Sequence, residues 1–122
     1  MTNPNTHTIA CQNDQFRQEL KVSLRRMHNV TLPGAYATTS TVGALSRARY
    51  FELIHEVVAF DTFTEVNDPH GEHDFGGVTI AGDRYFWKID YYANDTCEWG
   101  SEDPSDPRKC FRVMTIMHAS EY

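Results

Sequence analysis

The spacing of apolar residues changes once along this chain, close to Phe60, and the change limits the folds that the chain can adopt. Before Phe60, apolar side chains recur every three or four residues, which is the period of a helix that buries one side. After Phe60, they alternate with polar side chains, which is the period of a strand with one buried face. Helices followed by strands favour an α+β fold over alternating βα units. We therefore predict a flexible tail at residues 1–7 and a single α+β domain at residues 8–122, in which two helices pack on an antiparallel β-sheet.

Two stretches carry the helical period. In residues 46–59 one apolar stripe is complete, and Ser46 is placed to cap the first turn. The stripe consists of Tyr50, Leu53, Ile54, Val57 and Val58. The second stretch, residues 9–27, has Thr8 or Asn13 as its candidate cap. Its apolar positions are Phe16, Leu20, Leu24 and Met27, and its polar face holds Arg17, Lys21, Arg25 and Arg26.

Three later segments, residues 75–81, 84–92 and 110–118, alternate as strands do. The first two flank Gly82-Asp83, a favourable two-residue hairpin loop. Residues 84–92 are rich in aromatic side chains, and we expect one face of this strand to pack in the core and the other to form a partner-binding patch. Shorter strands are predicted at Val30–Leu32 and Ala37–Val42, about a Pro33-Gly34 turn, and at Phe60–Glu65.

Charge is divided unevenly along the chain. The formal net charge is −6, but residues 52–106 alone hold 14 acids and two bases, a net charge of −12. An acidic region of this kind repels nucleic acid and attracts basic protein surfaces, so we expect no direct nucleic-acid binding. No apolar run approaches the roughly 20 residues that span a membrane, and the N-terminus lacks a signal pattern. We therefore expect a cytoplasmic protein without membrane contact.

The run of residues 67–76 concentrates groups that can titrate or bind a metal. Imidazole and carboxylate groups are usual ligands of divalent transition metals, and the candidate ligands are His70, Glu72, His73 and Asp74. The same run could instead form an acid–base site in which His73 and Glu72 are the catalytic candidates. A third alternative is a structural turn, locked by hydrogen bonds from the backbone to Asp68 and Asp74. Because the spacing matches neither HExxH nor an EF-hand, we expect no cofactor, with a divalent metal ion as the alternative.

A second acidic segment, residues 98–107, surrounds a tryptophan with carboxylates and turn residues. An aromatic anchor ringed by charges is a plausible contact point for a protein partner. The candidate partner-binding residues are Glu98, Trp99, Glu102, Asp103 and Asp106. The alternative is an ordinary solvated loop, which is the common fate of a charge run.

Several segments share a further pattern. They are Asn13–Arg17, Thr41–Leu45, Phe60–Thr64, Asn67–Gly76, Phe86–Tyr92, Ser101–Pro104 and Val113–Met117. Together they resemble a family of small bacterial proteins, domain of unknown function 3768. Because that family carries no established activity, the resemblance implies no catalytic residue. Its members are similar to proteins carried on plasmids and other mobile elements, and small acidic proteins among such cargo often antagonise restriction or CRISPR systems, which is an association only.

Two functional hypotheses follow. In the first, the chain is a small acidic, non-catalytic interaction protein, a counter-defence inhibitor of the anti-CRISPR or anti-restriction type. It would present its acidic face to a basic surface of a nucleic-acid-binding defence complex. In the second, it is a small metal-dependent or acid–base enzyme centred on His70–Asp74.

Overall fold

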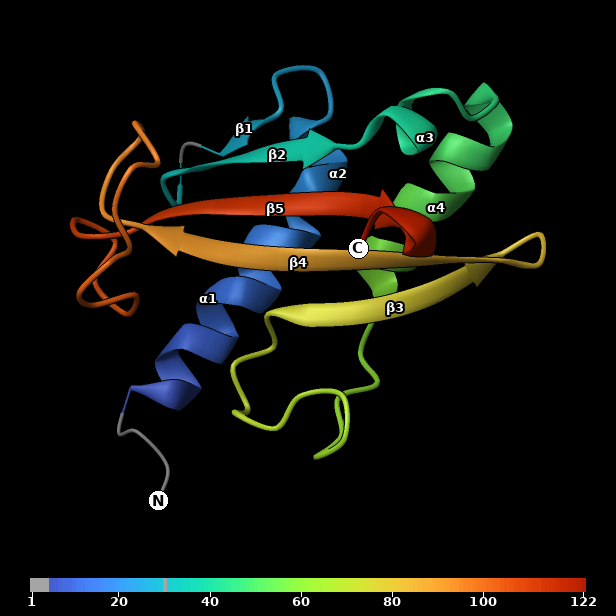
Figure 1. Ribbon diagram of the computed structural model, residues 1–122. Coiled ribbons are helices and arrows are strands. Elements are labelled where there is room, and N and C mark those ends of the chain that lie inside the picture. The colour runs from blue at the N-terminus through green and yellow to red at the C-terminus, as the bar shows by residue number, and fades with distance from the viewer. Residues whose placement is uncertain (1–4, 30) are drawn as a thin grey trace.

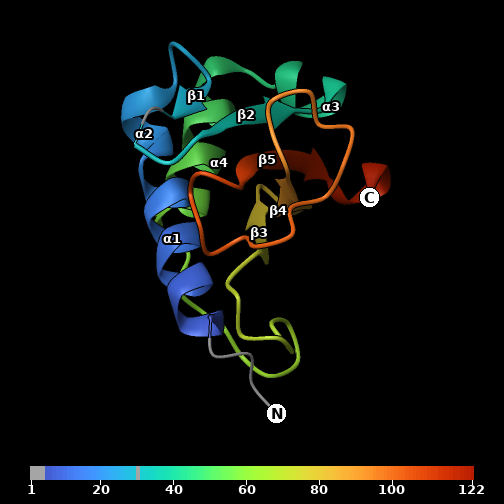
Figure 2. The same ribbon diagram turned by 90° about the vertical axis from the view of Figure 1, so that its left-hand side faces the viewer.

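One five-stranded sheet organises the molecule, with helices packed against one of its faces (Figure 1, Figure 2). The computed structural model describes residues 5–29 and 31–122. The strand order is β1-β2-β5-β4-β3, with β1 at His28–Asn29, β2 at Gly34–Thr38, β5 at Phe111–His118, β4 at Asp83–Tyr92 and β3 at Phe75–Ile80. Neighbouring strands are antiparallel except β2 and β5, which are parallel. The helices are α1 (Thr6–Gln18), α2 (Leu20–Ser23), α3 (Ser40–Gly43), α4 (Arg47–Ala59) and the short 3-10 helix η1 (Ala119–Glu121).

The predicted α+β class is confirmed, and α4 forms as the sequence indicates. Ser46 caps this helix, because its hydroxyl accepts a hydrogen bond from the backbone N–H of Arg49. Leu53, Ile54 and Val57 are buried on its inner side. Figure 2 shows α1, α2 and α4 on the same side of the sheet, so no long helix in residues 5–29 and 31–122 covers the opposite face.

The N-terminal helix differs from the prediction at both ends. It begins at Thr6, within the expected tail, so Thr8 and Asn13 lie inside the helix and do not cap it. Helical structure is also interrupted at Glu19 and ends at Ser23, four residues before the predicted end. The chain turns away because Met27 adopts a positive φ of 56° and its N–H binds the Ser23 carbonyl. The rest of the expected tail, residues 1–4, lies outside the described residues.

Three local predictions are wrong. Residues 60–65 form no strand, because the Phe60 and Phe63 rings instead turn inward against Trp87. The strand predicted at Ala37–Val42 instead spans Gly34–Thr38, and Ser40–Gly43 form the helix α3. The strand predicted at Val30–Leu32 does not form at its last two residues. Thr31 and Leu32 lie in a turn, where both donate backbone N–H groups to Asn29 Oδ1, and Val30 lies outside the described residues.

The β3–β4 hairpin is placed correctly, but its turn lies one residue earlier than predicted. Ile80 pairs with Asp83, so the two turn residues are Ala81 and Gly82. Both have positive φ, 52° and 87°, as a type I′ turn requires. The alternation in β4 is as expected, since Tyr85, Trp87 and Ile89 face the helices. None of the helices in the described part of the chain is long and apolar enough to cross a membrane.

The core lies between the helices and this inner face of the sheet. Trp87 is fully buried at its centre. Gly76 on β3 lies against the indole edge, where an added methyl group would collide with the ring. Complete burial of a side chain of this size contributes about 3 kcal/mol. The core therefore fixes the inner faces of β3 and β4, from which the two long loops depart.

Candidate functional site

The two acid-rich segments form loops, and each loop is fastened by a buried arginine. We call residues 60–74 the His73 loop and residues 93–110 the Trp99 loop. Arg17 of α1 is 1% exposed and Arg112 of β5 is fully buried. A buried charge is tolerated only where hydrogen bonds or opposite charges satisfy it, so the partners of these two arginines define how the loops are held.

Arg17 holds the beginning of the His73 loop. Its Nη2 donates to the Phe60 carbonyl at 2.8 Å, and its Nη1 lies 3.2 Å from Asp14 Oδ1. The guanidinium also lies against the Trp87 and Phe63 rings, at 4.9 and 5.5 Å from their centroids. Burial lowers the pKa of Arg17, which the nearby Asp14 carboxylate partly offsets. The helix is thereby joined to the loop and to the core aromatic residues.

His73 lies beside this arginine and is held on three sides. Its Nδ1 lies 2.9 Å from Asp14 Oδ1, and its ring stacks on Phe63 at 3.9 Å with an interplanar angle of 2°. Its backbone N–H donates to the Asp68 carboxylate, and its Nε2 lies 3.8 Å from Asp68 Oδ2. The positive φ of 57° at His73 is thus stabilised by the Asp68 hydrogen bond. The predicted Asp68 turn forms around the histidine.

Arg112 lies at the centre of a second network. Its Nε donates to Asn13 Oδ1 at 2.8 Å, and its Nη2 donates to Gln12 Oε1 at 2.8 Å and to the Pro104 carbonyl at 3.0 Å. Burial lowers the pKa of Arg112. Through these contacts β5, α1 and the Trp99 loop are joined at one buried group.

Asn13 links the two loops. Its Nδ2 donates to the Glu72 carbonyl at 2.9 Å and to the Tyr91 hydroxyl at 2.8 Å, while its Oδ1 accepts the hydrogen bond from Arg112 Nε. Tyr91 in turn donates to Glu72 Oε1 at 3.1 Å, and burial raises the pKa of this hydroxyl so that it remains a donor. Glu72 is therefore engaged in the network that fixes the His73 loop.

The predicted metal and catalytic residues do not converge on one centre. His73 faces Asp14, Glu72 faces Tyr91, and His70 is exposed. Burial, with the nearby Glu72 carboxylate, raises the pKa of Asp74. Within the described residues no group of three or more His, Cys, Asp or Glu side chains is placed to hold a metal ion, so a divalent metal remains a prediction without a ligand set.

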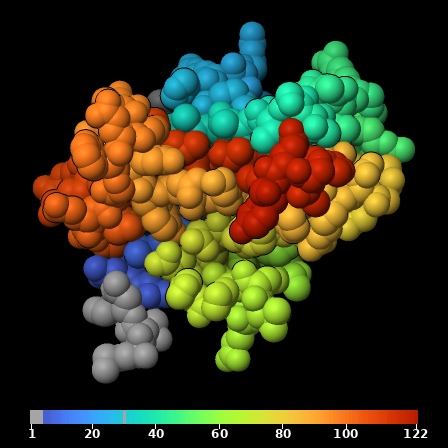
Figure 3. All heavy atoms as spheres, in the orientation of Figure 1, coloured from blue at the N-terminus to red at the C-terminus, as the bar shows by residue number. Residues whose placement is uncertain are grey.

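The Trp99 loop is long but closely fastened. Its base is closed by the Ala93 N–H donating to the Trp99 carbonyl at 2.8 Å and by the Ser101 N–H donating to the Tyr91 carbonyl at 3.1 Å. The Ser101 hydroxyl crosses the loop to the Lys109 carbonyl at 2.7 Å. Gln12 Nε2 donates to the Ser105 carbonyl at 2.9 Å. These bonds hold the loop in one conformation at one end of the sheet, the left-hand end in Figure 3.

The predicted partner-binding residues divide into two groups. Glu98, Trp99 and Glu102 are exposed, and Trp99, the one aromatic residue of this loop, is 74% exposed. Asp103 and Asp106 are half-buried, and their carboxylates contact other residues of the same loop. Asp103 accepts the Ser105 hydroxyl, and Asp106 pairs with Arg108 at 3.2 Å, which lowers the pKa of Asp106.

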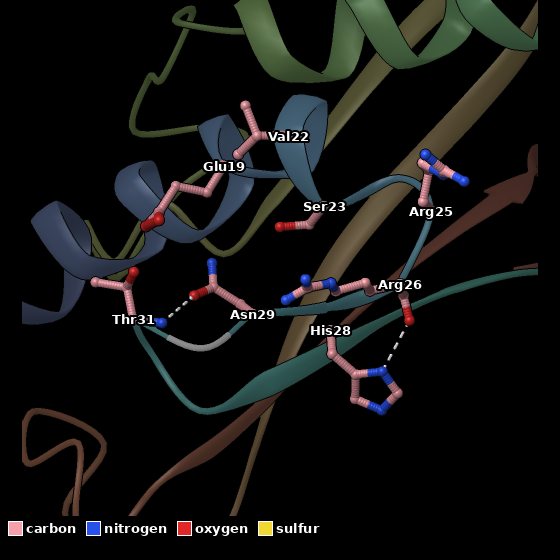
Figure 4. A pocket seen from close by; sticks show the side chains of 8 residues that line it. All are labelled: Glu19, Val22, Ser23, Arg25, Arg26, His28, Asn29 and Thr31. Atoms are coloured by element: carbon pink, nitrogen blue, oxygen red, sulfur yellow. Dashed lines mark hydrogen bonds between the residues drawn. The ribbon is translucent and has the colours of Figure 1, made fainter.

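Three bases of the N-terminal half, Lys21, Arg25 and Arg26, lie in α2 or between α2 and β1. A surface cavity of about 730 Å³ there is lined by Glu19, Val22, Ser23, Arg25, Arg26, His28, Asn29 and Thr31 (Figure 4). His28 Nδ1 donates to the Arg26 carbonyl at 2.8 Å. Figure 4 shows Arg25, Arg26 and His28 pointing in different directions rather than toward one centre. The positive charge is therefore spread over this end of the molecule.

Sequence reasoning missed the buried polar residues that fix both loops. Arg17 is predicted on the solvent face of the helix, but it lies in the core. Asn13 is a predicted cap, but it lies at the junction of the two loops, fully buried. One signal was available for Arg112, because it shares one face of the last strand with the apolar residues Met114 and Ile116.

Residues 38–121 match the family described as Protein of unknown function (DUF3768), so the chain belongs to this family. The matched region includes both loops and all of β3, β4 and β5, and it excludes α1. No curated protein and no solved structure matches the chain.

Proposed function

We propose that this protein is a non-catalytic interaction protein that presents the Trp99 loop to a basic surface of a nucleic-acid-binding protein. The single observation that carries the proposal is an exposed Trp99 ring on a loop that is already fixed. Exposing a tryptophan costs hydrophobic free energy that burial at a contact would recover, and a fixed loop loses little conformational entropy on binding. Tryptophan is also among the residues most enriched at energetic centres of interfaces.

Charge supports a basic partner. Glu98 and Glu102 flank Trp99 and are exposed. Neither forms an ion pair with another described residue, whereas Asp103 and Asp106 are engaged in the loop. Unpaired acids around an aromatic anchor would speed association with Lys and Arg and make it weaken with salt. As a finer proposal, the basic partner belongs to a host CRISPR or restriction complex, which the protein inhibits at its DNA-binding surface.

A functional assay tests this proposal. We would measure plasmid loss by CRISPR interference and by restriction in a bacterial host that expresses the protein or a variant. Trp99→Ala should abolish most of the protection, since loss of a buried tryptophan contact weakens binding by about 2 kcal/mol or more. Tyr122→Ala is the matched control, because this aromatic residue is similarly exposed, at 77%, and lies outside the loop. Equal protection by Trp99→Ala and the parent would contradict the proposal.

The acid–base alternative has one favourable observation, the short His73–Asp14 contact. A carboxylate bonded to Nδ1 can orient a histidine, as in many hydrolytic sites. The variant His73→Gln separates the two hypotheses in the plasmid-protection assay. Its unfolding is measured in parallel, to show that the variant is folded. The interaction proposal predicts protection equal to the parent in a folded variant, whereas an acid–base enzyme would lose it.

A further inference from the structure

The outer edge of β3 has unpaired backbone groups in a regular row. Among the strands of the described residues, β3 is the last of the sheet and pairs only with β4. The Asp74 carbonyl accepts the Ile89 N–H at 2.8 Å, and hydrogen-bonded pairs alternate along an antiparallel ladder. Gly76, Val78 and Ile80 therefore bond to β4. The backbone groups of Phe75, Gly77 and Thr79 point away from it.

This edge is free to accept another strand. Among the described residues, no hydrogen bond reaches the N–H or C=O of Phe75, Gly77 or Thr79. Thr79 is exposed, and the other two are half-buried. The strand contains no charged residue and no proline, which are the usual protections of an edge against unwanted pairing. A regular, unprotected edge is the surface to which extended peptides add in β-augmentation.

Arg84 supplies the chemistry that selects an occupant. It pairs with Thr79 across the hairpin and leans over Gly77, where an added methyl group would collide with its guanidinium. Its polar contact there is the Thr79 hydroxyl, at 3.4 Å. No carboxylate of the described residues forms an ion pair with it. A positive charge without an acid therefore lies directly above the centre of the open edge.

This charge disfavours pairing between two copies of the chain. Antiparallel pairing of two β3 edges through their outward groups would place Gly77 opposite Gly77 of the second copy. The two Arg84 guanidinium groups would then meet at the centre of the joint, and like charges in this position are destabilising. A strand with an acid at the same place would instead form a favourable cross-strand pair.

We propose that the β3 edge binds an extended peptide segment of a partner protein, with an acidic residue opposite Gly77 where Arg84 reaches. Backbone hydrogen bonds to Phe75, Gly77 and Thr79 give the segment its affinity. The Arg84 guanidinium gives it a preference for a carboxylate. This edge is separate from the Trp99 loop, so the inference does not depend on the proposed function.

Hydrogen exchange measured by NMR tests the site amide by amide. The probe is a synthetic peptide, Thr-Val-Glu-Val-Thr, and its comparator has lysine in place of glutamate. With the glutamate peptide, the amides of Phe75, Gly77 and Thr79 should become protected. Those of Gly76, Val78 and Ile80 should not change, because they already bond to β4. These three amides are an internal control in the same strand.

A charge reversal tests the selectivity. The parent should bind the glutamate peptide at least about fivefold more tightly than the lysine peptide, and Arg84→Glu should reverse that order. Arg84 is exposed at the sheet surface, so the variant should keep the parent's fold. No binding, protection at other amides, or equal affinity for both peptides would overturn the proposal. Concentration-dependent protection of the same edge without peptide would also overturn it, since the occupant would then be a second copy.

Discussion

The His73 loop and the Trp99 loop have similar compositions and opposite arrangements. Both are acidic, both contain proline and glycine, and both begin at the end of a regular element. The His73 loop turns Asp68 and Glu72 inward, to His73 and Tyr91. The Trp99 loop leaves its tryptophan and three of its acids, Asp95, Glu98 and Glu102, in solvent.

The difference shows that acidic composition alone does not identify a binding surface. What separates the loops is the position of buried donors. The Asn13 side chain and Arg17 contact the His73 loop from α1, and they give its polar groups internal partners. Arg112 contacts the Trp99 loop at the Pro104 carbonyl, away from Trp99, and so fixes its conformation without covering the ring.

Removing Arg112 should have the largest effect on the fold. Arg112→Met keeps much of the apolar stem but leaves the oxygens of Asn13, Gln12 and Pro104 without their donor. Buried acceptors left unpaired cost about 3 kcal/mol together. We expect urea denaturation to show that loss in the free energy of unfolding. Arg108→Met is the control, because Arg108 is exposed and should leave stability close to the parent's. Similar midpoints for the two variants would show that the buried network does not hold the Trp99 loop.

A smaller effect is expected in the His73 loop. Asp68→Ala removes the carboxylate, 5% exposed, that accepts the His73 N–H. One such hydrogen bond contributes about 1 kcal/mol, so the melting temperature should fall. His70→Ala, at an exposed position of the same loop, should not change it. Equal melting temperatures for Asp68→Ala and the parent would refute the structural turn.

The smallest effect expected is a difference in pH dependence between the loops. Burial raises the pKa of Asp74 above 3.8, so its contribution to stability is present below that pH and is lost as pH rises through the folded-state pKa. Arg108 lowers the pKa of Asp106 below 3.8, so its contribution is present above that pH and is lost as pH falls. Relative to the parent, Asp74→Asn should therefore gain stability as pH rises from the acid range, and Asp106→Asn should lose it. Unfolding curves across that range check both signs, and parallel pH profiles for the two variants would contradict the assigned environments.

The sequence predicted those parts of the fold that depend on a single local period. The α4 stripe, the β4 alternation and the Ser46 cap are each determined by neighbouring residues. The strand predicted at Phe60–Glu65 was wrong because the aromatic residues that suggested it pack on Trp87 instead. That contact joins residues distant in sequence, so no local pattern shows it. The hairpin turn shifted by one residue because the ladder pairs Ile80 with Asp83.

The candidate sites were predicted less completely. Asp68 was identified because an Asx residue before proline and glycine has a local role. The roles of Arg17 and Arg112 depend on partners tens of residues away, such as Phe60 and Gln12, which no local pattern indicates. For the same reason the sequence could not show that Asp103 and Asp106 contact residues of their own loop while the exposed Glu98 and Glu102 form no ion pair with another described residue.

The central claim is that the charges beside Trp99, rather than the overall acidity of the chain, guide the partner to this loop. The most direct test compares two double variants that remove the same net charge. Glu98→Gln with Glu102→Gln neutralises the loop, and Glu56→Gln with Glu65→Gln neutralises two exposed acids elsewhere. Affinity for the proposed basic partner, a CRISPR or restriction complex, would be measured at two salt concentrations. The first pair should weaken binding by about twofold to fivefold per residue at low salt and remove most of the salt dependence, while the second pair should bind as the parent does. Equal affinities and equal salt dependence for the two pairs would contradict the claim, because charge would then act through the whole molecule and the Trp99 loop would be ordinary solvated surface.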